Sequence, residues 1–295
     1  MIIDSHAHYA HNSYSGEFSW LSLNDGEYAL SRGNREEMLK ELNDAGIRCF
    51  IEPGIRLESN PEILAFCRAH PDRFFPAVGV HPTRTHQARW QDRRLLDGWA
   101  EAPEVVAIGE LGLDFHHPRK EQHRLNQYAW FLYQLRLAKK RGLPLVLHIR
   151  DADREAIAIL KRYRGNGGVV HCFNRGWDEA REYVALGYHI GIGGSLLQPE
   201  ERAAPLWDAV ARIPLERILV ETDAPYVLPW CKDAIRPKQL RRTRNSSAIL
   251  PKVVEKIAQL KNISPEAVAW QTGKNAVELF SLPVAWEETQ HEDMA

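Results

Sequence analysis

The chain has 295 residues, of which 44% are hydrophobic and 26% charged, a composition typical of a globular protein with a sizeable core. Its formal net charge of −1 argues against a general nucleic-acid coat protein, because sequence-independent DNA binding requires a dense basic surface. No apolar stretch approaches the roughly 20 residues needed to cross a bilayer, so we expect no membrane partner.

Eight apolar runs recur along the chain at an average spacing of about 30 residues, the length of a βα unit. Each run is continuous, as expected for parallel strands that are covered on both faces. The predicted strands lie within residues 2–8, 47–55, 74–82, 105–114, 143–150, 168–173, 188–195 and 217–225.

Helical patterns lie between these runs. Residues 60–70 begin with Asn60 as an N-cap and a proline in the first turn, and 120–141 carry apolar residues at helical spacing. Residues 178–187 end at Gly187, a suitable C′ residue. The alternation predicts an α/β fold, a (β/α)8 TIM barrel forming one domain over 1–283, with an open doubly wound sheet as the alternative. The GIGG sequence at 191–194 is not a dinucleotide-binding fingerprint.

Two segments fall outside this rhythm. Residues 9–35 are polar and aromatic and are long for a βα loop, so we expect a rim or lid insertion. Residues 284–295 are acidic and lack a core pattern, which predicts a loosely ordered tail. The four cysteines form no CxxC pair, and no basic leader precedes the first apolar run. We therefore expect reduced thiols in a cytoplasmic protein.

Titratable residues end several of the predicted strands. His6 and His8 are two positions apart, so their imidazoles can point to one side of an extended chain and reach one ion. Glu110 lies in a strongly apolar run, where a carboxylate is costly unless it is paired with an arginine or bound to a metal.

The later strands add further candidates of the same kinds. His148 and His171 each end a hydrophobic run on consecutive predicted strands. Asp223 ends the last run, and Glu221 competes with it because alternation places both on one side. Each histidine alone could be a hydrogen-bonded core residue, but together these side chains form the ligand set of two divalent metals. Two such ions can activate water for hydrolysis.

With these residues in view, the chain resembles the TatD family of metal-dependent deoxyribonucleases, which are amidohydrolase-like TIM barrels. The resemblance extends from residue 2 to about 282 and rests on ordered motifs. They are DSHAH (4–8), VGVHP (78–82), IGELGLD (108–114), LHIRDA (147–152), VHCF (170–173), GIGG (191–194) and ETDAPY (221–226), followed by RNS (244–246) and KIAQLKNISPEAVA (256–269).

The resemblance implies a divalent-metal-dependent hydrolase of phosphodiester bonds, an exonuclease acting on DNA, including single strands or 3′ ends, and in some members on RNA. It implies two ions, which the donor types allow to be Mg, Mn or Zn. His6, His8, Glu110 and Asp223 would hold one ion, and Glu110, His148 and His171 the other. The resemblance favours Asp223 over Glu221, and we assign catalytic roles to Glu110 and to Asp223, which would take the proton of the attacking water.

Three residues are candidates for binding the substrate. His81 could contact a phosphate or serve as a structural histidine, and Arg150 shares the side of His148 and could clamp a phosphate. Asp114 could orient His148 or cap a turn. Further candidates are the basic loop and three aromatic residues that could stack bases or simply pack: Arg236, Lys238, Arg241, Arg242 and Arg244, with Trp20, Trp230 and Tyr226.

Three segments depart from the family pattern, namely 9–35, 115–122 and 174–176. All three are expected where substrate would enter. They motivate an alternative function, in which a TIM-barrel hydrolase acts on a small ester, amide or lactone. A metal-dependent scaffold without catalysis is the third, non-enzymatic hypothesis.

Overall fold

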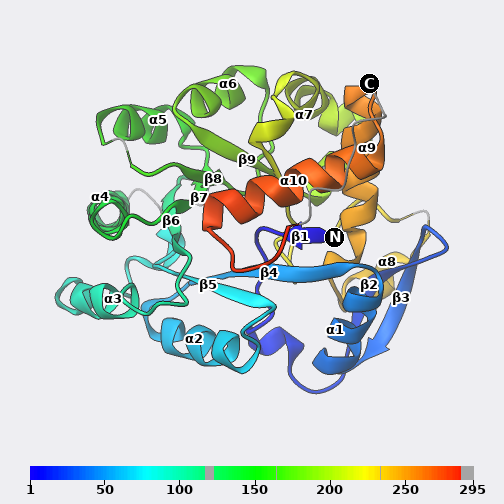
Figure 1. Ribbon diagram of the computed structural model, residues 1–295, viewed down its shortest axis with the longest axis horizontal. Helices are drawn as coiled ribbons and strands as arrows, with labels where there is room; N and C mark the ends of the chain where they lie inside the picture. Colours follow the sequence, from blue (N-terminus) through cyan, green and yellow to red (C-terminus); the bar gives the residue numbers. More distant parts are fainter. Residues whose placement is uncertain (117–122, 164, 233, 287–295) are drawn as a thin grey trace.

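The computed structural model describes residues 1–116, 123–163, 165–232 and 234–286. Eight parallel strands are hydrogen-bonded to one another in chain order (Figure 1), and each lies within one of the predicted apolar runs. The strands are β1 (Ile2–Asp4), β4 (Ile47–Pro53), β5 (Phe74–Val78), β6 (Ala107–Asp114), β7 (Leu145–Arg150), β8 (Gly168–Val170), β9 (Tyr188–Ile192) and β10 (Ile218–Val220).

The sheet closes where its first and last strands meet. The Ser5 N–H donates to the Val220 carbonyl at 3.0 Å, and the Asp223 N–H donates to the His6 carbonyl at 2.9 Å. A parallel bridge between Ala7 and Ala224 continues this seam. These bonds confirm the predicted TIM barrel and exclude the open doubly wound sheet.

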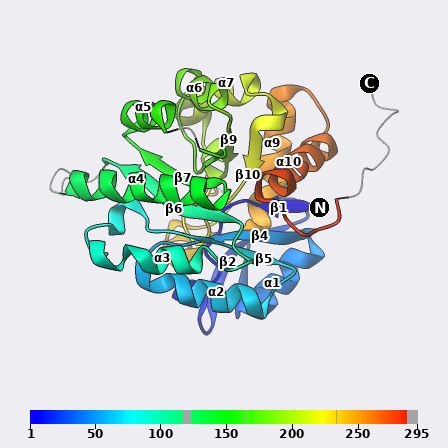
Figure 2. The same ribbon diagram turned by 60° about the vertical axis from the view of Figure 1, so that its left-hand side comes forward.

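Helices surround the barrel (Figure 2). The predicted helices at 60–70 and 178–187 are confirmed, and the described part of the one at 120–141 begins at Arg124. The helix predicted at 120–141 was expected to bury an apolar stripe that includes Leu125. This expectation is partly wrong, because Leu125 is 83% exposed, while Trp130 and Phe131 are buried. The helices are α1 (Arg35–Asp44), α2 (Asn60–Ala69), α3 (Arg93–Trp99), α4 (Arg124–Arg141), α5 (Asp153–Arg162), α6 (Trp177–Ala185), α7 (Glu200–Arg212), α8 (Pro237–Leu240), α9 (Leu250–Lys261) and α10 (Pro265–Phe280).

Apolar side chains fill the interior of the barrel toward the N-terminal ends of its strands. Ile3, Ile51, Val146 and Leu219 belong to one buried cluster, to which α10 adds Phe280. The side chain of Asn275 on the same helix donates to the carbonyls of Leu215 and Ile218, where β10 begins. Helix α10 therefore closes the N-terminal end of the barrel, and the C-terminal ends of the strands remain for chemistry.

The segment 9–35 contains two antiparallel strands, β2 (Phe18–Asn24) and β3 (Glu27–Gly33). The short β11 (Thr243–Arg244) pairs with β2. Leu21 packs against Cys231 and Ile249, which follow β10, so this small sheet rests on the rim beside the last barrel strand. Of the predicted tail, residues 287–295 lie outside the described residues, whereas Val284 and Trp286 pack against the cluster inside the barrel.

Among the described residues, no helix is long and apolar enough to span a membrane. The four cysteines are free thiols, and three of them, Cys49, Cys67 and Cys231, are buried.

The fold predicts a specific loss of stability in acid. Burial, and then Arg217, lower the pKa of His189 on β9 to about 4, so between pH 6.5 and 4 the unfolded chain takes up a proton that the folded chain does not. The contribution of His189 to the free energy of unfolding is therefore largest above pH 6.5 and falls toward pH 4. We expect wild type to lose roughly 1–2 kcal/mol more than His189→Gln between pH 7 and 4.5 in urea unfolding with a chelator present. Equal losses in the two proteins would contradict this.

Candidate metal centre

Glu110 lies at the centre of a cluster of imidazoles at the C-terminal end of the barrel. Its Oε1 is 2.8 Å from His148 Nδ1, 2.7 Å from His171 Nε2 and 3.2 Å from His81 Nε2. The Glu110 side chain is only 3% exposed, so these contacts replace water around the carboxylate.

The second oxygen of Glu110 faces a different group. Oε2 is 3.5 Å from His6 Nε2 and 3.9 Å from His8 Nε2. Asp223 completes this side, with its Oδ1 3.6 Å from His6 Nε2 and 3.4 Å from His8 Nε2. The structure therefore brings together all six predicted metal ligands, and the Glu110 carboxylate lies between the two groups.

The donor atoms fit divalent ions in type and spacing. His6 Nε2 and His8 Nε2 are 3.2 Å apart, and His148 Nδ1 and His171 Nε2 are 3.0 Å apart. In a tetrahedral site, Zn–N bonds of about 2.0–2.1 Å place neighbouring ligand atoms roughly 3.3–3.4 Å apart, a little more than these separations. Among the described residues, His6–His8–Glu110 and His81–Glu110–His148 form two groups able to hold a cation. Buried carboxylate and imidazole groups thus support divalent-metal binding.

The charges in the cluster reinforce one another. Burial alone would raise the pKa of Glu110, but His81, His171 and His6 hold it well below its usual range. Burial would likewise lower the pKa of His171, yet Glu110 and Glu221 raise it well above normal. The Glu110 carboxylate is therefore ionised, and its negative charge, which raises the pKa of His171, also favours a cation.

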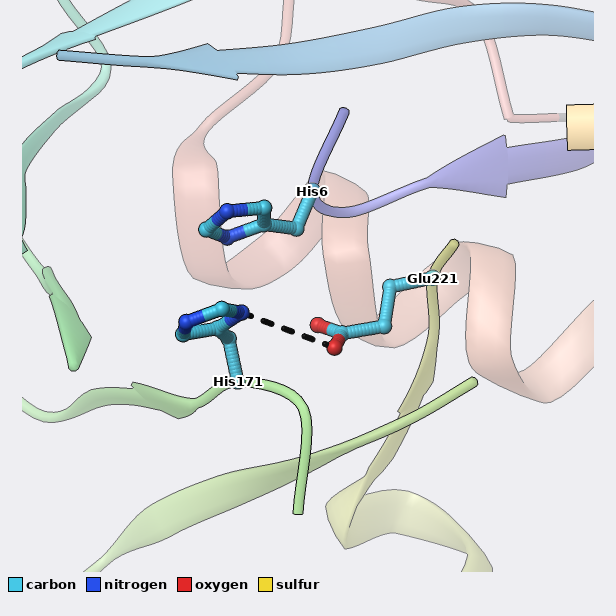
Figure 3. A group of neighbouring side chains, drawn as sticks. All are labelled: His6, His171 and Glu221. Carbon is cyan, nitrogen blue, oxygen red and sulfur yellow. Dashed lines mark ion pairs between the residues drawn. The ribbon is translucent and has the colours of Figure 1, made fainter. Parts of the chain in front are cut away.

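Two carboxylates lie behind the imidazoles. Asp114 Oδ2 is 3.6 Å from His148 Nε2, the ring nitrogen turned away from Glu110. Glu221 Oε1 is 3.7 Å from His171 Nδ1 (Figure 3). The same oxygen also accepts the Cys172 N–H. Such partners fix the tautomer and the orientation of a metal-binding histidine. Glu221 also forms a third potential cation group with His6 and His171, whose rings stack at 3.8 Å.

His81 occupies a distinct position. Its Nδ1 accepts the Thr83 N–H at 3.1 Å, so the neutral ring carries its proton on Nε2, which faces Glu110. Burial lowers the pKa of His81 to about 4, which keeps the ring neutral. His81 can therefore donate a hydrogen bond toward a carboxylate or a substrate oxygen.

Asp4 holds the two ends of the barrel seam in place. Its Oδ1 accepts the backbone N–H groups of His6 and Thr222, both at 3.1 Å. Its Oδ2 accepts the hydroxyl groups of Thr222 and Ser247, both at 2.6 Å. This fully buried carboxylate fixes His6 relative to Asp223 on the last strand. Its position between an apolar run and the HxH pair is the signal that sequence reasoning left unused.

The outer candidates are placed differently. Arg150 is exposed at the end of β7, beside Asp114 in the sheet register. Trp20 is 2% exposed and packs on Phe18, so the structure does not support base stacking there. Trp230 is flanked by Arg202 and Lys232. Tyr226 is 45% exposed, with its ring 6.0 Å from that of His8.

The rim segments form their own contacts. Arg175, from the segment 174–176, pairs with Asp151 and Asp153. From 115–122, His116 Nδ1 lies 2.8 Å from Asp151 Oδ2, and 117–122 lie outside the described residues. In the basic loop, Arg244 lies over the Phe18 ring, and the other four cations are exposed: Arg236, Lys238, Arg241 and Arg242.

The chain is similar to several known proteins. A family model described as TatD related DNase matches residues 3–281. A protein of Erwinia billingiae named 3'-5' ssDNA/RNA exonuclease TatD is 36% identical over 252 residues, which cover 85% of this chain and 94% of that protein. A protein of the same name from Cronobacter turicensis is 38% identical over 256 residues, covering 84% and 92%. The TatD homologue YjjV of Escherichia coli K12 superimposes with a TM-score of 0.80 and 28% identity, over 96% of this chain and 98% of that one.

The position of Glu221 predicts how it affects metal affinity. If Glu221 orients His171, Glu221→Gln should weaken metal binding about 10–100-fold without abolishing it. Glu110→Ala should remove binding of at least one ion, because both sides of the centre use this carboxylate. Calorimetric titration measures both effects, with exposed Glu278→Gln as the matched control. Unchanged affinity in Glu221→Gln would exclude the orienting role, and a loss as complete as that in Glu110→Ala would make Glu221 a ligand.

Proposed function

The chain belongs to the TatD-related DNase family, and on this premise we propose that it is a divalent-metal-dependent exonuclease. Its substrates are the phosphodiester bonds at the 3′ ends of single-stranded DNA and RNA, the nucleic acids that the names of its relatives specify. The observation that carries the proposal is the Glu110 carboxylate, whose two oxygens face two separate groups of donor atoms.

We propose two ions per chain, Mg, Mn or Zn, with His6, His8, Glu110 and Asp223 around one and Glu110, His148 and His171 around the other. Such ions lower the pKa of water and neutralise charge on a phosphate. The mixture of donors supports all three metals, because imidazole suits zinc and carboxylate suits magnesium and manganese.

Asp223 is the proposed proton acceptor. Burial would raise its pKa, but His8, His6 and His171 hold it below the usual range, so the carboxylate is ionised at neutral pH. Its side chain is 16% exposed, whereas that of Glu110 is 3% exposed, so a water molecule can reach Asp223 more easily. The water oxygen forms a bond to phosphorus and gives its proton to Asp223, while the bond from phosphorus to the oxygen of the remaining strand breaks and that oxygen takes up a proton from solvent.

Two further residues hold the substrate in this proposal. The exposed guanidinium of Arg150 at the end of β7 binds phosphate oxygens, for which its planar donor set is suited. His81 donates its Nε2 proton to an oxygen of the scissile group, and Asp114 acts through His148. A cytoplasmic site of action is supported by the four free thiols, which persist in a reducing compartment.

The proposal predicts that Glu110→Ala abolishes turnover. Its loss removes a donor from both sides of the centre, so the rate should fall roughly 10⁴-fold or more. The measurement is cleavage of 3′- and 5′-labelled single-stranded DNA and RNA with Mg²⁺, Mn²⁺ and Zn²⁺, with product ends mapped.

Exposed Asp178→Ala on α6 serves as the control and should retain full activity. Retained activity in purified Glu110→Ala would refute the assignment of the centre. If wild type cleaves no nucleic acid with any metal but hydrolyses a member of a panel of small esters, amides and lactones, the nuclease proposal fails.

A further inference from the structure

A cleft of about 310 Å³ opens directly beside the metal centre. His8 and Tyr226 form the wall that it shares with the centre, and residues 10–12 form another part of its lining. The rest of the lining comes from the end of β4, from the segment that follows it and from Arg84. This volume is at the lower end of the range for small-molecule sites, so it suits a single nucleotide rather than a length of strand.

Two arginines give the cleft its charge. Arg56 and Arg84 both line it, and neither takes part in an ion pair within the described part of the chain. The Arg84 Nε is buried and has no hydrogen-bond partner. Two guanidinium groups without carboxylate partners in one concave site are suited to a phosphate.

The carboxylates of the cleft do not neutralise these arginines. Glu52 is buried, and its oxygens accept the N–H groups of Tyr9 at 2.7 Å and Ala10 at 3.1 Å, directly after His8. Glu62 is exposed to solvent. Glu52 therefore fixes the wall that carries His8, and the arginines remain available to a ligand.

Tyr226 supplies an aromatic surface between the cleft and the centre. Its side chain is 45% exposed, and its ring contacts those of His8 at 6.0 Å and His11 at 6.2 Å. Burial raises the pKa of Tyr226, and Arg84 and Arg56 oppose that rise, so both guanidinium groups act on this side chain. An exposed ring beside a phosphate site is suited to stacking a nucleic-acid base.

We propose that this cleft binds the nucleotide on the 5′ side of the scissile bond, with its base against Tyr226 and its 5′-phosphate on Arg56 and Arg84. The inference rests on the proposed exonuclease function. A terminal nucleotide with a free 3′-hydroxyl carries no phosphate beyond the scissile one. The next phosphate along the strand therefore lies on the 5′ side of the scissile bond. This is the phosphate that Arg56 and Arg84 would bind.

Three thymidine dinucleotides test the proposal by calorimetry on chelator-treated protein: TpT, pTpT with a 5′-phosphate, and TpTp with a 3′-phosphate. Wild type should bind pTpT at least tenfold more tightly than TpT, which corresponds to about 1.4 kcal/mol. Arg56→Ala and Arg84→Ala should bring that ratio toward one, and Arg84→Lys should keep part of it.

Tyr226→Ala should weaken TpT and pTpT by the same factor, and Tyr226→Phe should restore both affinities. Arg181→Ala, an exposed arginine on α6, is the matched control and should keep the ratio. Equal binding of TpT and pTpT by wild type would overturn the proposal. Preferential binding of TpTp through the same arginines would also overturn it, because the cleft would then hold the terminal nucleotide.

Cleavage assays separate this proposal from the exonuclease function. Metal-loaded wild type should show a lower KM for pTpT than for TpT, and the arginine variants should lose that difference. If wild type cleaves single strands but treats the two dinucleotides alike in binding and in KM, the cleft assignment alone fails. If wild type cleaves no nucleic acid, the exonuclease proposal fails, while the affinities still show whether the cleft recognises a 5′-phosphate.

Discussion

The burial of the Glu110 carboxylate is the constraint on which the rest of this structure depends. An isolated carboxylate in so apolar a barrel would be very costly, and here imidazoles from four different strand ends offset that cost. His6 and His171 are themselves buried, and His81 and His148 are partly buried. Further carboxylates lie near the second nitrogens of two of these rings, Asp114 at 3.6 Å from His148 Nε2 and Glu221 at 3.7 Å from His171 Nδ1. One buried charge thus accounts for a shell of polar residues.

Strict alternation along the strands would not assemble this centre. Ile3 and Ala107 belong to the cluster inside the barrel, so regular strands would turn His6 and Glu110 outward. The register of β6 against β7 shifts between Gly109 and Leu111, and β1 ends at Asp4 before the chain bends toward His6. A bulge that redirects a side chain is a common device beside active sites. Asp4 then fixes the bent segment against the last strand.

Long apolar runs and the titratable residues at their ends are local signals, so the sequence was sufficient for the eight strands and for five of the converging residues. Asp223 was preferred over Glu221 only through the family resemblance, because alternation places both on one side of the strand. The rim was harder to predict. Within the segment 9–35, residues 18–33 form a hairpin whose turn residues, Asp25 and Gly26, both have positive φ. An Asp-Gly pair between two strands is a known hairpin signal. The cleft was not predictable, since Arg56 and Arg84 come from different loops and meet Tyr226 only when the barrel closes.

The charge of the chain is compatible with a nuclease that grips an end rather than a strand. A protein that neutralises many phosphates needs a broad basic surface, and its affinity falls steeply with salt, by about 0.7 in logarithmic slope per phosphate on a single strand. Here the net charge is −1, and the unpaired guanidinium pair is confined to one cleft beside the centre. The proposed site contacts one or two phosphates and stacks one base on a tyrosine. Its specificity therefore comes from where the strand terminus lies relative to these contacts. Its binding should therefore depend weakly on salt and strongly on terminal chemistry.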